Sequence, residues 1–524
     1  MWNPPSALSP EEQKIATRTQ KARKFFVFLR TLRHELLDAD FQQMLAKSDS
    51  PEPGGKAPVE AGVLALATLL QAYCHVSDQE AVDLTVMDQR WQMVLDCLGA
   101  EHPPFSRGTL FHFRLRLIAH NLDKTLLDRT VALAEQTGGV GARQLRAALD
   151  STPLFGAGRG EDTLHLLGQA LRQAVGLAAK ALGTSAAVLR AEAGLELVGQ
   201  SSLKAALALA WGAPTARASA LRLVLEEGGR WQSWLEQPQR LSAQEPPLQE
   251  VLETIDQSVA QDTEPDPEGG PGVRRLKKHV APDRRSSMED ADLRHGRKRS
   301  SKTFNGFKEH CALDLDSKVT REVGVGPANQ PEHEAVELLA EELEKGSGLF
   351  QLDLDLGSMA SPRMAQWAAQ GVHIMARPWP QGGPLFTKDD FTLDFQRDTV
   401  TCPKGQTVPL VPGRDAQFPA SACDACPVRA QCTKARLGQG RRLTIRQDEQ
   451  FQQKLRAQIK TKRGRASLRK RTAVEQAISH HVAHPGRRAR DKGLRKHQFD
   501  GRRHAAGSTL QVAARYEEER QLAS

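Results

Sequence analysis

The sequence predicts a mixed α/β protein in which a mixed sheet is combined with separate helical segments and a small cysteine-containing segment. Apolar residues recur at helical spacing from about residue 10 to residue 130. After residue 300 the pattern changes to short apolar runs that favour strands alternating with helices. A polar, turn-rich segment at 385–450 contains four cysteines. The 524-residue length is enough for about two to four structural units.

Residues 1–135 are expected to form an all-helical N-terminal domain. Ser106 precedes an apolar run that continues to Leu117, and it can cap a helix there. Basic residues alternate with the apolar ones in this run, so a strand also fits locally, but the helical neighbourhood favours a helix. Such a helix either reads DNA or is an ordinary element of a helical domain. Arg107 and Arg114 are its candidate DNA contacts.

Residues 140–384 are expected to form the sheet-bearing core, interrupted by a helical insert at about 155–265. A short strand is expected to end at Asp150. The Ala- and Leu-rich stretch 164–252 predicts helices that serve as a scaffold. Residues 262–272 are acidic and rich in Pro and Gly, which is typical of a linker.

After this linker, residues 310–315 and 319–325 flank Asp316-Ser317-Lys318 and predict a β-hairpin. The expected elements that follow are a helix over 334–345, a strand over 349–355, a helix over 362–370 and a strand over 372–375. The cysteine-bearing insert at 385–450 comes next. Residues 451–524 are expected to contain a basic helix that completes the core, followed by a basic tail.

Basic residues are concentrated in two parts of a chain whose net charge is +9. Residues 274–308 contain twelve Lys or Arg against four acids, and residues 454–503 contain seventeen against three. Clusters of this kind are typical of surfaces that face phosphates, and a solvated basic loop is the alternative. A polyanionic partner is therefore expected.

The sequence predicts a cytoplasmic protein without a membrane partner. The longest apolar run, 61–73, is shorter than the ~20 residues that span a bilayer. The N-terminus is polar and Pro-rich and does not resemble a signal peptide. Seven cysteines, an odd number, do not favour a disulfide framework.

Four thiols lie close together in the insert, at Cys402, Cys423, Cys426 and Cys432. One Cys-X-X-Cys pair with two outlying cysteines is compatible with a tetrahedral Zn²⁺ site. A small polar insert has little core of its own, which favours structural Zn²⁺. Unliganded thiols and an iron–sulfur cluster are the alternatives.

Three acidic residues, Asp150, Asp355 and Glu475, lie in sequence contexts where an acid is unusual. The two aspartates each end an apolar strand-like run, and the glutamate lies in a helical stretch crowded with Lys and Arg. For any one of them alone, turn capping is the usual explanation. Together they could hold two Mg²⁺ ions, for which Mn²⁺ can substitute. Two such ions about 3.5–4 Å apart can support phosphodiester cleavage.

Several motifs resemble those of bacterial insertion-sequence transposases. They are Val280-Ala-Pro-Asp-Arg-Arg285, Arg294-His-Gly-Arg-Lys298, Ser301-Lys-Thr-Phe-Asn-Gly-Phe-Lys308, Pro327-Ala-Asn329 and Asp355-Leu-Gly-Ser-Met-Ala-Ser-Pro362. The resemblance covers most of the chain and implies a DDE triad on an RNase H-like sheet. It assigns the two aspartates of that triad to Asp150 and Asp355 and the glutamate to Glu475. Arg471 matches the arginine that precedes this glutamate by four positions.

The resemblance implies a transposase that binds insertion-sequence ends, cleaves DNA with divalent metals and joins the freed 3′-hydroxyl to target DNA. Its partners would be double-stranded DNA, both terminal repeats and target, and further copies of itself in a homodimer or higher oligomer. The phosphate contacts expected near the catalytic cleft are Arg294, His295, Arg297, Lys298, Lys302, Lys308 and Arg471.

Three positions depart from the family pattern. Ser358 and Leu468 stand where relatives carry tyrosines, and Val482 stands where they carry a lysine. These departures leave the acids in place and affect how the DNA end is handled. They support the alternative of a catalytically inactive, transposase-derived DNA-binding protein. A stand-alone nuclease of the same fold is a third reading.

Asp353 competes with Asp355 for the second aspartate of the triad. We prefer Asp355, because Gly357 and the small residues beyond it fit the strand-to-helix turn of the family.

Overall fold

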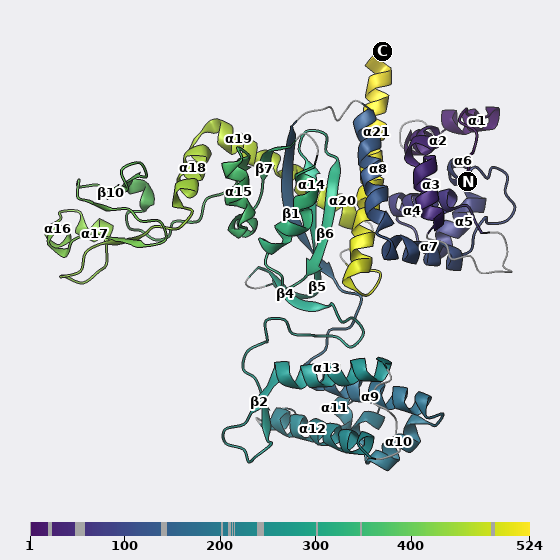
Figure 1. Cartoon of the computed structure of the whole chain (residues 1–524), viewed down its shortest axis with the longest axis horizontal. Coiled ribbons are helices and arrows are strands. Elements are labelled where there is room, and N and C mark those ends of the chain that lie inside the picture. The colour runs from purple at the N-terminus through teal and green to yellow at the C-terminus, as the bar shows by residue number, and fades with distance from the viewer. Residues whose placement is uncertain are drawn as a thin grey trace.

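The computed structural model places a mixed sheet between a layer of N-terminal helices and a cysteine-bearing segment, with a separate helical body beyond one end of the sheet (Figure 1). The structure describes residues 2–18, 24–47, 58–137, 144–200, 203–207, 211, 213, 215–237, 246–299, 302–345, 348–483 and 488–523.

The N-terminal layer consists of helices, as the periodicity predicts. They are α1 (Pro10–Arg18), α2 (Lys24–Leu36), α3 (Ala39–Lys47), α4 (Ala61–Cys74), α5 (Asp78–Met87), α6 (Gln89–Leu95), α7 (Arg107–Ala119) and α8 (Leu122–Gln136). Helix α4 is apolar along nearly its whole length and lies buried among the others. The ambiguous run after Ser106 is helical, and the Ser106 hydroxyl accepts a hydrogen bond from the Thr109 amide at 3.1 Å. This cap confirms the predicted start of α7.

The main sheet is mixed, which confirms the predicted mixed α/β class. Its strands run in the order β4-β5-β1-β7-β8, and β6 pairs with β5 as well. Strand β1 is antiparallel to β5 and parallel to β7, which in turn is parallel to β8. The strand bounds are β1 (Leu145–Phe155), β4 (Arg294–Arg299), β5 (Lys302–Asp314), β6 (Thr320–Pro327), β7 (Leu349–Asp353) and β8 (His373–Met375).

Strand β1 does not end at Asp150, so that expectation is wrong. It continues through Pro153 to Phe155, paired with β5 along this length. On its other side, β1 pairs with β7 only as far as Ala148. Proline is tolerated in a strand where its position needs no amide donor toward a neighbouring strand. Asp150 therefore lies where β1 extends beyond the end of β7.

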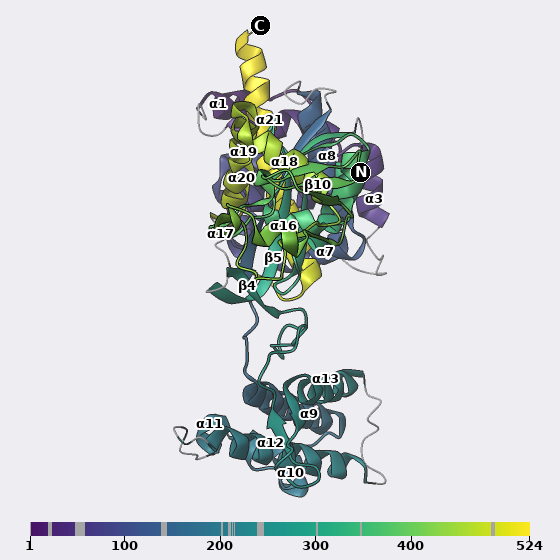
Figure 2. The same ribbon diagram turned by 90° about the vertical axis from the view of Figure 1, so that its left-hand side faces the viewer.

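The helical insert forms its own body, which both views show beyond one end of the main sheet (Figures 1 and 2). Its core is apolar and includes Trp231 and Trp234, whose rings stack at 5.0 Å. Its elements are α9 (Thr163–Ala181), α10 (Ala186–Ala193), η1 (Leu197–Gly199), α11 (Leu203–Ala206), α12 (Ala216–Leu235) and α13 (Pro246–Asp262).

Within the described residues no single helix is long and apolar enough to cross a membrane. Helices α9 and α10 meet the length and apolarity criteria only when they are taken together, as a pair bent by 114°.

The segment predicted as a linker is partly ordered. Strands β2 (Thr263–Pro265) and β3 (Arg274–Leu276) pair as a short antiparallel hairpin, which corrects the expectation. Asp262, at the end of α13, is buried and ion-paired with Arg284 at 2.9 Å. This ion pair and the hairpin hold the return connection against the helical body.

Short elements complete the core and the cysteine-bearing insert. Those of the core are η2 (Glu334–Val336), α14 (Glu337–Leu343), η3 (Leu356–Ala360) and α15 (Arg363–Ala369). Those of the insert are η4 (Lys388–Asp390), β9 (Thr392–Asp394), β10 (Thr399–Thr401), β11 (Thr407–Pro409), β12 (Asp415–Gln417), α16 (Ala420–Asp424), α17 (Arg429–Cys432) and β13 (Arg442–Thr444). Three helices return the chain to the sheet: α18 (Glu449–Lys460), α19 (Lys462–Lys470) and α20 (Thr472–Ala483).

The expected basic tail is instead a long helix, α21 (Leu494–Ala523), so that expectation is wrong. The helix lies between β6 on one side and helices α4 and α8 on the other (Figure 1). Its buried apolar residues include Phe499, Leu510 and Ala513. Their burial explains why this polar-looking segment is folded against the rest of the chain.

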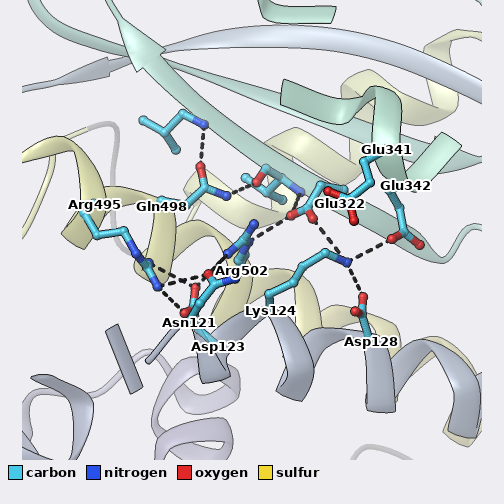
Figure 3. A network of polar contacts seen from close by, with 12 residues as sticks. Asn121, Asp123, Lys124, Asp128, Glu322, Glu341, Glu342, Arg495, Gln498 and Arg502 are labelled. Atoms are coloured by element: carbon cyan, nitrogen blue, oxygen red, sulfur yellow. Dashed lines mark hydrogen bonds and ion pairs between the residues drawn. The ribbon is translucent and has the colours of Figure 1, made fainter. Parts of the chain in front are cut away.

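A network of buried ion pairs joins α21 to α8 and β6 (Figure 3). Arg502 contacts Asp123 at 3.2 Å and Glu322 at 3.0 Å, and both acids are almost completely buried. Asp123 also pairs with Arg495. Lys124 reaches Glu322 at 3.3 Å from the other side. Arg502, which lies in the basic cluster that the sequence suggested for phosphate contact, is thus mostly buried and paired within the protein.

Candidate active site

Asp150, Asp355 and Glu475 line a single pocket of about 560 Å³. Strands β1 and β7 are parallel neighbours, so their carboxyl ends open at the same edge of the sheet. Helix α20 packs on β1 and β5 through Val474 and Ile478. This packing brings Glu475, the residue after Val474, beside the two aspartates. Acids that are far apart in the sequence therefore share one concave surface.

The structure distinguishes Asp355 from Asp353. Asp355 is exposed on the pocket and caps η3, where its carboxylate accepts a hydrogen bond from the Leu356 amide at 2.8 Å. Asp353 is fully buried within β7, where its Oδ1 accepts a hydrogen bond from Gln351 at 2.6 Å. Burial raises the pKa of Asp353 to about 6. Of the two, only Asp355 lies on the pocket.

Asp353→Asn is expected to stabilise the protein at pH 7 by about 1–3 kcal/mol. The pKa of Asp353 is higher in the folded chain than in the unfolded chain, so wild-type stability falls as pH rises from about 4 to about 6. An uncharged asparagine avoids this loss and can still accept from Gln351. Thermal unfolding of both proteins at pH 4 and pH 7 tests the prediction. An advantage that is equal at the two pH values would contradict it.

Arg471 lies between two acids of the pocket. Its guanidinium is 3.0 Å from Glu475 and 3.4 Å from Asp150. Burial raises the pKa of Asp150, and the charges of Glu475 and Asp355 act in the same direction, whereas Arg471 and the Ser151 amide oppose them. A cluster of this kind is stabilised by a positive charge. In the structure Arg471 supplies that charge.

Whether the pocket can hold a divalent metal depends on the position of Arg471, which now lies between Asp150 and Glu475. Within the described part of the chain, no three His, Cys, Asp or Glu side chains are close enough to hold one ion. The donor set nevertheless consists of the hard carboxylate oxygens that Mg²⁺ prefers. A divalent ion could contact both Asp150 and Glu475 once Arg471 moved aside.

Glu332 is a fourth acid on this pocket that the sequence did not reveal. It accepts a hydrogen bond from the Ser151 hydroxyl at 3.2 Å. A Cβ atom at Gly357 would lie 2.1 Å from Glu332 Oε2, so the glycine leaves room for this carboxylate. Glu332 lies in a turn after the hairpin, and only the proximity of that hairpin to the acids could have indicated it.

His310 lies under the same edge of the sheet. It lines a small cavity together with Asp150, Glu332 and Asp355. Burial lowers the pKa of His310 to about 3, with the nearby charge of Lys308 acting in the same direction. His310 is therefore neutral at physiological pH.

Three of the predicted phosphate contacts, Arg297, Lys298 and Lys308, line the acid pocket together with Arg471. Arg297 and Lys298 are exposed on β4. Lys308 is half-buried and donates to the Gln330 carbonyl at 2.8 Å. Burial lowers the pKa of its ammonium group. The acids thus lie beside several basic side chains.

The other predicted contacts do not line this pocket. Arg294 is ion-paired with Asp283 at 2.7 Å, and His295 shares a hydrogen bond with Asn305 at 2.8 Å. Lys302 is exposed near the start of β5.

In the N-terminal layer, Arg107 is exposed at the start of α7. Arg114 is ion-paired with Asp78 and donates to Gln71 at 2.8 Å, so its charge is held within the helical layer.

Residues 401–511 match a family model described as a transposase DDE domain. The matched span includes Arg471, Glu475 and all of α18, α19 and α20. This stretch of the chain is similar to a transposase DDE domain. No curated protein and no solved structure matches the chain. DDE transposases generally act on DNA with the help of divalent metals, which agrees with the acidic and basic side chains that meet at this pocket.

The four cysteines of the insert line a pocket of about 240 Å³. The Arg441 amide donates a hydrogen bond to Cys423 Sγ at 3.4 Å. Burial raises the pKa of the Cys432 thiol, and the other three thiols act in the same direction, which places all four within electrostatic range of one another. In the described structure, no three of them are close enough to bind one ion.

Proposed function

We propose that this transposase binds the ends of an insertion sequence, cleaves them and joins them to target DNA. The observation that carries the proposal is that Asp150, Asp355 and Glu475 share one pocket with Arg297 and Lys298. Acids suit divalent metals, and the basic side chains suit the phosphates of the substrate. The strand arrangement is compatible with an RNase H-like core.

The chemistry assigns a role to each part of the pocket. Two Mg²⁺ or Mn²⁺ ions would activate the attacking oxygen and stabilise the leaving oxygen in an in-line displacement. The three carboxylates would hold the ions, and Arg471 would move aside to admit them. Arg297, Lys298 and Lys308 would hold the flanking phosphates and fix the DNA strand relative to the carboxylates. Water as the attacking group gives cleavage, and a freed 3′-hydroxyl gives joining.

Incubation of the purified protein with end DNA tests this proposal. The DNA that flanks the reading frame supplies the terminal-repeat substrate. Nicking and joined products are expected with Mg²⁺ or Mn²⁺ and not with a chelator. Nicking without joined products would instead identify a nuclease. DNA binding without any metal-dependent cutting would identify a catalytically inactive descendant.

The second candidate function is that of a catalytically inactive, transposase-derived DNA-binding protein. It is favoured because two tyrosines of the family pattern are replaced near the acid pocket. Ser358 lines the small cavity beside Asp150, and Leu468 lines a basic pocket beside Glu475. Neither can supply an aromatic hydroxyl to a DNA end. The side chain of Val482, the third departure, lies outside the described residues.

The proposal includes the partners of the protein, its oligomeric state and its location in the cell. The partners would be double-stranded terminal-repeat and target DNA, and the protein would act as a homodimer or higher oligomer in the bacterial cytoplasm, associated with the nucleoid. Exposed Arg107 on α7 supports a role for the N-terminal layer in binding DNA ends. The separate helical body, α9 to α13, supplies surface for contacts between copies.

The proposal also includes one structural Zn²⁺ held by Cys402, Cys423, Cys426 and Cys432. The insert supports this because its strands are only three residues long and its apolar core is small. We expect about one zinc per chain by elemental analysis, lost in Cys423→Ser and kept in Cys97→Ser, whose thiol lies in the N-terminal layer. Zinc-free wild-type protein, or equal zinc in both variants, would contradict the site.

A further inference from the structure

A second basic pocket meets the acid pocket on the other side of Arg471. It has a volume of about 890 Å³ and shares Asp355, Arg471 and Glu475 with the first. Its remaining basic lining includes Arg377, which follows β8, and Arg469 at the end of α19. The reactive acids therefore lie at a junction between two basic cavities.

Two arginines of this second pocket are not balanced by a nearby acid. Arg377 and Arg469 are exposed, and neither has an ion-pair partner among the residues that the structure places. Two other basic residues of the same wall, Arg456 and Lys460, are instead paired with Asp389 at 3.0 and 2.8 Å. Unpaired guanidinium groups beside a cleft are suited to phosphates, which they can bind through two hydrogen bonds.

The two pockets are not equivalent. Asp150 lines the first pocket and is absent from the lining of the second, which has only Asp355 and Glu475 of the three acids. A cleavage step that uses all three carboxylates therefore places its scissile phosphate on the side of the first pocket. The second pocket reaches Asp355 and Glu475 without Asp150 and is left for another strand.

We propose that the second pocket binds the sugar–phosphate backbone of a second DNA strand, the target strand to which the cleaved end is joined. Arg377 and Arg469 hold its phosphates. This inference rests on the proposed cleavage and joining activity. It adds a target-binding surface whose two arginines, Arg377 and Arg469, do not line the first pocket.

The test compares nicking of an uncut end with joining of a precut end to a target duplex, in single-turnover reactions. The double variant Arg377→Gln/Arg469→Gln is expected to lower the ratio of joined to nicked product about tenfold or more, the scale on which removal of one charge-assisted hydrogen bond acts. Arg414→Gln, an exposed arginine just before β12 in the cysteine-bearing insert, is the matched control. Equal loss of nicking and joining, or an unchanged ratio, would overturn the assignment.

A binding measurement separates this inference from the proposed function. The fluorescence anisotropy of a labelled target duplex, added to protein already bound to end DNA, measures binding of the target at the second pocket without catalysis. The double variant is expected to weaken target binding and to reduce its log–log salt dependence by about 0.9 for each phosphate that the protein no longer neutralises. Unchanged target binding overturns the inference. A wild-type protein that binds the target but never cuts overturns only the proposed function.

Discussion

Asp150→Asn and Glu475→Gln are each expected to lower metal-dependent nicking of end DNA by about 10²-fold or more, while binding of the DNA persists. Each change removes one charged carboxylate from the shared pocket and keeps the size of the side chain. The loss of one preorganised electrostatic group in an active site commonly costs this much. Single-turnover nicking measures the effect, and a gel shift with the same DNA measures binding.

Asp316→Asn is the matched control for the acid substitutions. Asp316 is also a carboxylate of the core, but it lies on the hairpin turn, paired with Arg146 at 2.9 Å and outside the pocket. Its loss is expected to leave nicking close to the wild-type rate. Wild-type nicking by both Asp150→Asn and Glu475→Gln would refute the catalytic assignment of the acids.

Asp123→Ala is expected to destabilise the protein by about 3–5 kcal/mol, the cost of removing one partner from a buried ion pair. Asp123 is only 2% exposed and pairs with both Arg495 and Arg502. Its removal leaves two guanidinium groups of α21 without this acid (Figure 3). A fall in the thermal unfolding midpoint of roughly 2–4 °C per kcal/mol is expected for a unit of this size.

Lys345→Ala, at the edge of the same network, is the control for this substitution. Lys345 is 45% exposed and contacts Glu342 at 3.1 Å. A solvent-exposed pair contributes less than about 1 kcal/mol, so its loss is expected to change the unfolding midpoint little. Equal effects of the two substitutions would show that the buried network does not join α21 to α8.

The strand and helix pattern of the core was predictable because its signals are local. The hairpin of β5 and β6 has two runs rich in apolar residues around a polar turn, and β7 is a short apolar run. Asp150, Asp355 and Glu475 could be selected because each is an acid in an unusual context. Their meeting in space depends on the order of the strands, which single-sequence patterns do not contain.

The features that were missed depend on contacts between distant parts of the chain. The charge pattern of α21 is typical of a DNA-binding tail, yet Arg502 is paired with Asp123 and Glu322, far away in the sequence. The length of β1 beyond Asp150 depends on where β7 stops pairing. Glu332 could be recognised as a lining residue of the acid pocket only from the folded structure, in which the hairpin lies against the acids. A count of charged residues along the sequence cannot show which of them form ion pairs in the folded protein.

The position of Glu475 on α20 has a consequence for the synthesis of the protein. Strands β1 and β7 bring the two aspartates together within the first 355 residues, but the glutamate arrives on a helix made after the entire cysteine-bearing insert. Helix α21, which locks the N-terminal helices to the sheet, is made later still. A nascent chain on the ribosome thus lacks the third acid until nearly all of it has been translated. A prematurely terminated polypeptide ending before residue 475 would lack one of the three acids that we propose to be catalytic.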